Sequence, residues 1–371
     1  MRRVAVAGYG LTKFRKSNDS LYTLACESAK DLFQNSMNLS QQDVQAVLVS
    51  TCDNEQYTSS IISEMLGIRP KISHRIESMC NSGGNAIISA YSFIASGLCD
   101  VALVIGVEKA ESPGARLEWD MSRGQFKHPA HWAAMFAKAH MNEYGTTEEQ
   151  MAMVSVKNHD NALMNPKAYF QNKITLDDVL DSKPVVKPVK LYDCSAPCDG
   201  AASLLLVSEE RAREFTDQPV WITGIGQRTV SASFSKVSEL TRMESTILAA
   251  RDAYAMANIE PRMVNVAEVH DAFTICEILA YEDLGFVKKG QGGIFAEELQ
   301  TGIDGRVAVN PRGGLIGTGH PIGATGVAQA VEIAMQLRGE AGKRQIKNCK
   351  IGLAHNLSAA ATSTTIVTMG V

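Results

Sequence analysis

The chain has 371 residues, of which 45% are hydrophobic and 20% charged, a composition typical of a folded protein with a large core. Its 36 Lys and Arg against 40 Asp and Glu give a net charge of −4 with both signs mixed, which argues against nucleic acid as the main ligand. No apolar run is long enough for a membrane span, and eight scattered cysteines predict reduced thiols and a cytoplasmic location.

Short apolar runs rich in β-branched residues alternate with helical stretches along the chain. The predicted strands cover residues 4–8, 44–50, 101–107, 202–207, 220–225, 264–269 and 351–354. Runs that are apolar throughout are typical of strands buried on both faces, so the pattern predicts an α/β protein.

Two of these strands open similar segments. Residues 4–10 and 220–226 each read as a strand followed by Gly-x-Gly. A dinucleotide-binding turn needs a third glycine, but the chain has Lys13 and Thr229 at those places, so a nicotinamide site is not favoured. The repeated pattern indicates an internal duplication.

The duplication predicts a first half at residues 1–217 and a second half at residues 218–371. Within the first half, the alternation of strands and helices is lost over residues 112–189. We interpret this stretch as a long inserted loop region folded over the first half, which is a usual place for substrate contacts.

A glycine-rich turn at residues 80–86 begins with Cys80 and leads into a predicted helix. Unpaired N–H groups and the positive dipole at a helix N-terminus stabilise negative charge, so this position is expected to raise the thiolate fraction of Cys80. The alternative is a buried structural cysteine at a tight contact.

The second half has a comparable turn at residues 317–326, which contains His320 before Pro321 and also leads into a helix. The glycines on both sides favour a functional histidine over a packed core histidine, and imidazole is the usual general base near neutral pH.

Two more histidines, His270 and His355, follow predicted strands. Because the carboxyl ends of parallel strands meet in one crevice, we expect them to lie near Cys80 and His320. A metal site is not predicted, since the lone Cys-x-x-x-Cys at residues 194–198 has no second pair of ligands.

The segment at residues 313–326 reads Gly-Gly-x-x-Gly-x-Gly-His-Pro-Ile-Gly-Ala-Thr-Gly and resembles a motif of the thiolase superfamily. Four shorter motifs support the resemblance: Glu-Ser-Met-Cys-Asn-Ser-Gly-Gly at 77–84, Asp-Gly-Ala-Ala at 199–202, His-Asp-Ala-Phe at 270–273 and His-Asn at 355–356. The last two make the chain most similar to the sterol-carrier-protein-type and archaeal acetyl-CoA acetyltransferases.

The resemblance implies a thiolase fold: two βαβαβ halves in five layers (αβαβα), with residues 112–189 as a loop domain over the coenzyme A thioester. It implies condensation of two acetyl-CoA molecules to acetoacetyl-CoA and CoA, with no permanently bound cofactor, as in the mevalonate route. It also implies a homodimer or tetramer, and by analogy a hydroxymethylglutaryl-CoA synthase and a zinc-ribbon/OB-fold protein as partners. The alternatives are a degradative 3-ketoacyl-CoA thiolase and a thiolase-like scaffold subunit with only acyl-loading activity.

By the same resemblance, Cys80 carries the acyl group, and its N–H stabilises the tetrahedral intermediate. His320 takes the thiol proton. His270 lies near the thioester oxygen and, with His320, holds the oxygen of the enolate.

The chain departs from the family at the second catalytic cysteine, which many thiolases place at the position of His355 or of Ala272. Neither residue is Cys here. We therefore expect His355 to act as the acid and base of the carbon–carbon step, because its intrinsic pKa suits that role. Cys276 is a weaker candidate.

Overall fold

The structure is a computed structural model that describes residues 2–112, 126 and 128–371. Among these residues, ten strands form one mixed sheet in the order β10-β9-β11-β12-β8-β1-β7-β4-β2-β3. The strands are β1 (Val4–Leu11), β2 (Ala46–Ser50), β3 (Ile72–Ile76), β4 (Val101–Glu108), β7 (Gly200–Ser208), β8 (Val220–Thr229), β9 (Val266–Glu268), β10 (Ala308–Val309), β11 (Ile351–Ser358) and β12 (Ser363–Gly370).

The sheet repeats one topology. The order β1-β7-β4-β2-β3 in the first half matches β8-β12-β11-β9-β10 in the second, and equivalent neighbours have the same parallel or antiparallel pairing. The halves join where β1 pairs antiparallel with β8, at Ala5 beside Trp221 and Val6 beside Val220. The predicted α/β class and duplication are confirmed.

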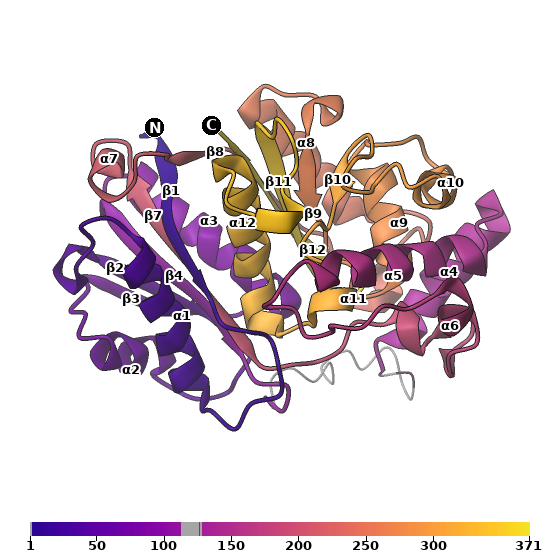
Figure 1. The fold of residues 1–371 in the computed structure, drawn as a ribbon, viewed down its shortest axis with the longest axis horizontal. Coiled ribbons are helices and arrows are strands. Elements are labelled where there is room, and N and C mark those ends of the chain that lie inside the picture. The colour runs from indigo at the N-terminus through magenta and orange to yellow at the C-terminus, as the bar shows by residue number, and fades with distance from the viewer. Residues whose placement is uncertain (1, 113–125, 127) are drawn as a thin grey trace.

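Helices form the layers on either side of these strands. Figure 1 shows α3 (Ser82–Ala95) and α12 (Ile322–Arg338) between the two halves, and α12 contacts β4 and β7 of the first half and β11 of the second. The helices α1 (Leu21–Asn35) and α8 (Glu244–Ala257) pack against the outer faces of the first and second halves. The other helices outside the insertion are α2 (Thr58–Met65), α7 (Ala212–Phe215), α9 (Thr274–Asp283), α10 (Gly292–Glu297) and α11 (Gly314–Thr318).

The predicted insertion contains more regular structure than its sequence indicated. It holds α4 (Ala130–Tyr144), α5 (Glu148–Leu163), α6 (Leu176–Leu180) and a hairpin of β5 (Pro184–Val186) with β6 (Val189–Lys190). Its residues 113–125 and 127 lie outside the described part. The helix α5 packs on α9, α10 and α11, so the helical part of the described insertion covers the second half and not the first, which was the half expected. Contacts with the first half include those of the loop at Lys167, which pairs with Phe14 and Asp31.

Glycines let the two central helices approach closely at their N-terminal ends. A Cβ on Gly83 would lie 2.8 Å from the main-chain nitrogen of Val327, and a Cβ on Gly326 would lie 2.6 Å from that of Gly84. Real Cβ atoms do not come so close, so only glycine fits here. This contact brings the turn that carries Cys80 next to the turn that carries His320. No helix of the described residues is long and apolar enough to cross a membrane.

Candidate active site

Cys80 lies in a short 3₁₀ turn, Met79–Asn81, between β3 and α3. Met79 has a φ of 53°, in the left-handed region that non-glycine residues rarely adopt, so the turn is strained at the residue before the thiol. The thiol is buried and accepts hydrogen bonds from the N–H groups of Ala359 and of Cys80 itself.

The expected increase in thiolate fraction is wrong for the structure without substrate. Burial raises the pKa of the Cys80 thiol to about 12, despite the two N–H groups that lower it. Removing the thiolate from water costs more than these N–H groups recover. Cys80 is therefore a neutral thiol at rest and needs a base when it reacts.

His320 lies between Gly319 and Pro321, just before α12. Its Nδ1 is 2.7 Å from the hydroxyl oxygen of Thr325, and that hydroxyl donates to the carbonyl oxygen of Pro321. The hydroxyl can therefore only accept from His320, which places the imidazole proton on Nδ1. Nε2 has no hydrogen-bond partner among the described residues, and burial lowers the pKa of His320 to about 3. The ring is neutral with a free lone pair on Nε2.

His270 follows β9 and is fully buried. Its ring meets that of His320 edge to face, with centroids 5.0 Å apart, and its Nδ1 lies 3.1 Å from Nδ2 of Asn356. Burial, and to a smaller extent His320 and His355, lower the pKa of His270 well below its usual value. This histidine is also neutral.

Three of the four predicted residues come together. Cys80 Sγ and one ring nitrogen from each of His270 and His320 lie within 4.8 Å of one another. Such a group could hold a soft divalent metal, but a metal requires all three atoms as deprotonated donors. The same three atoms also fit acid–base chemistry, since a thiol lies beside a histidine whose Nε2 has no partner among the described residues.

His355 does not join this group. Its Nδ1 accepts a hydrogen bond from the main-chain N–H of His270 at 3.4 Å, and its Nε2 lies 3.0 Å from the hydroxyl of Thr246. Burial also lowers its pKa to about 3. Both nitrogens are occupied by structural contacts, so the geometry does not support the expected acid–base role of His355.

The sequence interpretation missed Asn356, which takes the place beside His270. Successive residues of a strand point to opposite faces, so only one of His355 and Asn356 can face the thiol. The signal that could have found it is the alternation along β11, combined with the glycines that receive its side chain, Gly84 of the first half and Gly326 of the second. Cys276, the weaker candidate, lies inside α9 in the apolar core.

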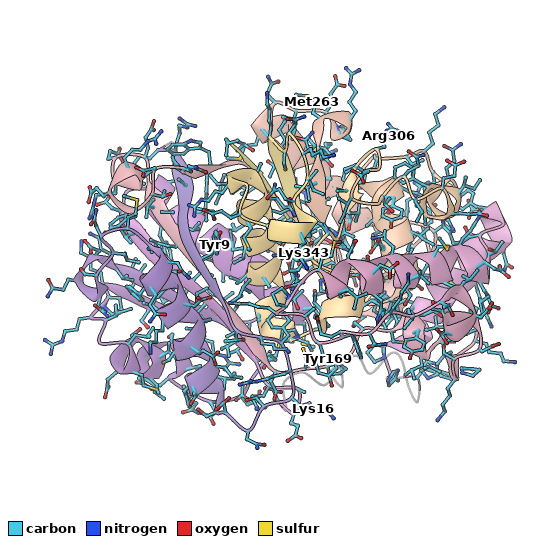
Figure 2. The ribbon with its side chains drawn as sticks, in the orientation of Figure 1. Tyr9, Lys16, Tyr169, Met263, Arg306 and Lys343 are labelled. Carbon is cyan, nitrogen blue, oxygen red and sulfur yellow. The ribbon has the colours of Figure 1, made fainter. Side chains whose placement is uncertain are left out.

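The insertion holds the loop of His320 in place. The main-chain N–H of Tyr169, labelled in Figure 2, donates to the carbonyl of Thr318 at 3.2 Å. Asn158 of α5 donates to the Asp271 carboxylate, which also accepts the N–H groups of Leu315 and Ile316 at the start of α11. These contacts fix α11, and with it the turn before His320.

Two cavities are relevant to this group, one lined by the two alanines that follow Ala359 and the other lined by His320 itself. One, of about 300 Å³, is lined by Lys236, Arg242, Ala360 and Ala361, the two alanines directly following Ala359. The other, of about 460 Å³, is lined by His320 and by Cys198. Both are large enough for part of a small-molecule substrate.

A duplicated α/β fold that places a cysteine at the start of one central helix and a histidine at the start of the other defines a class of protein with a buried Cys–His–His centre. The chain matches the thiolase N-terminal domain over residues 4–210 and the thiolase C-terminal domain-like family over residues 226–370. The protein belongs to the thiolase family.

Relatives cover nearly the whole chain. The chain is 42% identical to an acetyl-CoA acetyltransferase of Methanothermobacter thermautotrophicus, with 96% of each chain covered. It is 33% identical to the benzoylsuccinyl-CoA thiolase subunit BbsB of Thauera aromatica, covering 93% and 92%. A solved structure, the Ltp2-ChsH2(DUF35) aldolase, superposes with a TM-score of 0.87 at 29% identity, covering 98% of this chain and 97% of that one.

Proposed function

We propose that the protein is an acetyl-CoA C-acetyltransferase that condenses two acetyl-CoA molecules into acetoacetyl-CoA and CoA through an acyl-cysteine at Cys80. The observation that carries the proposal is a buried thiol within 4.8 Å of a ring nitrogen of His320, whose Nε2 has no hydrogen-bond partner among the described residues. The name of the relative from Methanothermobacter thermautotrophicus supports this choice of substrate.

In the first half-reaction, His320 Nε2 takes the proton of the Cys80 thiol as the sulfur attacks the thioester carbonyl of acetyl-CoA. The N–H groups of Cys80 and Ala359, which face Sγ, are suited to hold the oxyanion that forms. The intermediate collapses, the CoA thiolate leaves, and His320 returns the proton to it. The products are acetyl-Cys80 and CoA, and His320 is again neutral.

In the second half-reaction, the same Nε2 removes a proton from the methyl group of a second acetyl-CoA. The enolate carbon attacks the carbonyl carbon of acetyl-Cys80, and His270 holds the enolate oxygen. The carbon–sulfur bond then breaks, acetoacetyl-CoA is released, and the Cys80 thiolate recovers its proton from His320. One base serves both steps, which replaces the role expected of His355.

The cavity beside Ala360 and Ala361 is suited to coenzyme A. Lys236 and Arg242 provide positive charge for its phosphates, although Glu239, which pairs with Arg242, and Glu244 also line the cavity. The two alanines directly follow Ala359, whose N–H group faces Cys80. CoA would therefore enter as a substrate along this cavity, and no permanently bound cofactor is needed.

The second candidate is a scaffold subunit that only loads an acyl group. The absence of a second cysteine from the Cys–His–His group favours it, since the carbon–carbon step then depends on one base. The remaining alternative is an enzyme that degrades longer 3-ketoacyl-CoA. It differs from the acetyltransferase in the length of the acyl chain that it accepts.

Partners are part of the proposal. BbsB is named as a subunit, and the name of the aldolase structure joins Ltp2 with a DUF35 component, which supports a partner subunit. That this partner is a zinc-ribbon/OB-fold protein, and that a hydroxymethylglutaryl-CoA synthase joins it in the cytoplasm, is part of the proposal. The edge strand β3 pairs only with β2 among the described residues, and the neighbouring helix α2 exposes Ile61 and Met65. An unpaired edge beside exposed apolar residues supports a homodimer through this side.

The test is to incubate the purified protein with acetoacetyl-CoA and CoA and follow the loss of the enolate absorbance. In parallel, exchange of labelled CoA into acetyl-CoA measures the first half-reaction alone. Turnover in both assays supports the acetyltransferase. Exchange without thiolysis, with and without a DUF35-type partner, would establish the scaffold candidate instead, and preference for longer substrates would establish the degradative enzyme.

A further inference from the structure

Asn356 makes two hydrogen bonds that together determine the protonation of His270. Its Oδ1 lies 3.1 Å from the main-chain nitrogen of Gly84, at the start of α3. A main-chain N–H can only donate, so the atom that faces it must be the amide oxygen. The amide nitrogen of Asn356 therefore faces Nδ1 of His270, at 3.1 Å.

An amide nitrogen can only donate, so Nδ1 of His270 must be the acceptor. A neutral imidazole with a bare Nδ1 carries its proton on Nε2. The neighbouring residue of β11 contributes separately, because Nδ1 of His355 accepts the main-chain N–H of His270. Two successive residues of one strand thus hold the main chain and the ring of His270.

The position of Asn356 is itself tightly determined. A Cβ on Gly326 of α12 would lie 2.3 Å from Oδ1 of Asn356, so a side chain at that position would displace the amide. Asn356 is buried, and it connects the N-terminal parts of both central helices with His270. Rotating the amide would set its nitrogen against the Gly84 N–H, leaving a buried donor unpaired.

We propose that Asn356 is a positioning residue that fixes His270 as the Nε2–H tautomer, so that His270 is a hydrogen-bond donor while His320 is the base. The inference rests on the proposed function for its kinetic consequence. His320 presents a bare Nε2 and His270 presents an Nε2–H to the same centre. Two chemically identical side chains thereby take opposite roles, the base that accepts the substrate's proton and the donor that stabilises the enolate oxygen.

The kinetic test uses Asn356→Asp, which keeps size and the acceptor for Gly84 but replaces the donor with an oxygen. His270 must then place a proton on Nδ1 to pair with it. Thiolysis of acetoacetyl-CoA is expected to fall at least about a hundredfold, as when an oxyanion donor is removed. Exchange of labelled CoA into acetyl-CoA, which uses Cys80 and His320, is expected to change by less than about fivefold. Equal losses in both assays would overturn the assignment.

A second measurement does not depend on activity. In protein labelled with ¹⁵N-histidine, nitrogen chemical shifts distinguish bare from protonated ring nitrogens, and His270→Gln identifies the signals of His270. The wild type is expected to show a bare Nδ1 and a protonated Nε2, and Asn356→Asp the reverse, a protonated Nδ1 and a bare Nε2. A protonated Nδ1 in the wild type, or an unchanged tautomer in the variant, would overturn the proposal. If the wild type shows no turnover, the proposed function fails, whereas this spectrum still decides the role of Asn356.

Discussion

The two halves of the molecule have the same strand order but different side chains at equivalent strand ends. When the last paired positions of the two halves are aligned, Ser50 beside Gly106 and Glu268 beside Ala354, Cys52 becomes the counterpart of His270 and Glu108 the counterpart of Asn356. The first half contributes the nucleophile, and the second contributes both histidines of the centre. The duplication therefore supplies the framework of strands and helices. The chemistry comes from side chains that differ between equivalent positions of the two halves.

Glu108 and Asn356 show how equivalent positions differ in what they can do. Glu108 Oε2 accepts the N–H of Gly323 in α12, and Asn356 Oδ1 accepts the N–H of Gly84 in α3, each at 3.1 Å. Each half thus caps the central helix that belongs to the other. A carboxylate can only accept hydrogen bonds, whereas an amide can also donate them. Only the second half uses such a donor, when the amide nitrogen of Asn356 donates to His270.

The largest effect is expected from Cys80, and Cys52 of the same half serves as its comparison. Cys80→Ala removes the nucleophile and should lower both CoA exchange and thiolysis on the order of 10⁴-fold or more. Cys52→Ala, at the equivalent of His270, changes a buried side chain outside the Cys–His–His group and should stay within a few-fold. Both variants are measured in the two assays, with labelled acetyl on the protein as a further readout. Comparable losses would mean that Cys52 takes part in the chemistry.

Gly326→Ala tests whether the contact between the halves assembles the site. The new Cβ would lie 2.3 Å from Asn356 Oδ1 and 2.6 Å from the Gly84 nitrogen, so α3 and α12 must separate. We expect a loss of about 2–4 kcal/mol in the free energy of unfolding and at least about tenfold in thiolysis. Gly339→Ala is the matched control, because it faces open space at the end of α12 and costs only backbone strain. Equal losses of stability and thiolysis in the two variants would show that packing between α3 and α12 does not assemble the site.

The sequence predicted the class, the duplication and the three residues that meet, because buried strands and glycine turns leave local patterns. It did not predict β3, whose residues are half exposed and lack a continuous apolar run, or the helices of the insertion, which are stabilised mainly by packing on the second half. The protonation state of Cys80 depends on its burial, and the orientation of His355 depends on which face of the sheet it occupies. Both are determined only once the chain has folded. His355 and Asn356 are adjacent in sequence, and only the sheet decides which one meets His270.

Acidification is expected to destabilise the second half before the first. Burial lowers the pKa of His320 and His355 to about 3 and that of His270 well below 6.5, so between about pH 6.5 and 3 the unfolded chain binds protons that the folded chain does not. The stability that these histidines contribute is therefore complete above pH 6.5 and falls on acidification, by roughly 1 kcal/mol per pH unit for each histidine. The raised pKa values of buried Glu268 and Asp271 act in the opposite direction, so the measured slope is the difference between the two contributions. Urea unfolding from pH 7 to 5 measures this slope, which His355→Gln should make shallower. Hydrogen exchange should show β9 and β11 losing protection before β2 and β4, and the reverse order would contradict the comparison.

The smallest effect is expected from Glu108→Gln, the counterpart of Asn356→Asp. The glutamine oxygen can take the place of Oε2, which accepts the N–H groups of Cys52 and Gly323, and its amide can donate to the Thr51 hydroxyl that now donates to Oε1. Because the two N–H groups keep their acceptor and only the Thr51 hydroxyl proton loses one, we expect no more than about 1 kcal/mol in the free energy of unfolding and less than about fivefold in thiolysis. Thermal unfolding and the thiolysis assay check this. A loss as large as that of Asn356→Asp would mean that the Glu108 charge acts on the centre, and that the two capping positions are equivalent in chemistry as well as in place.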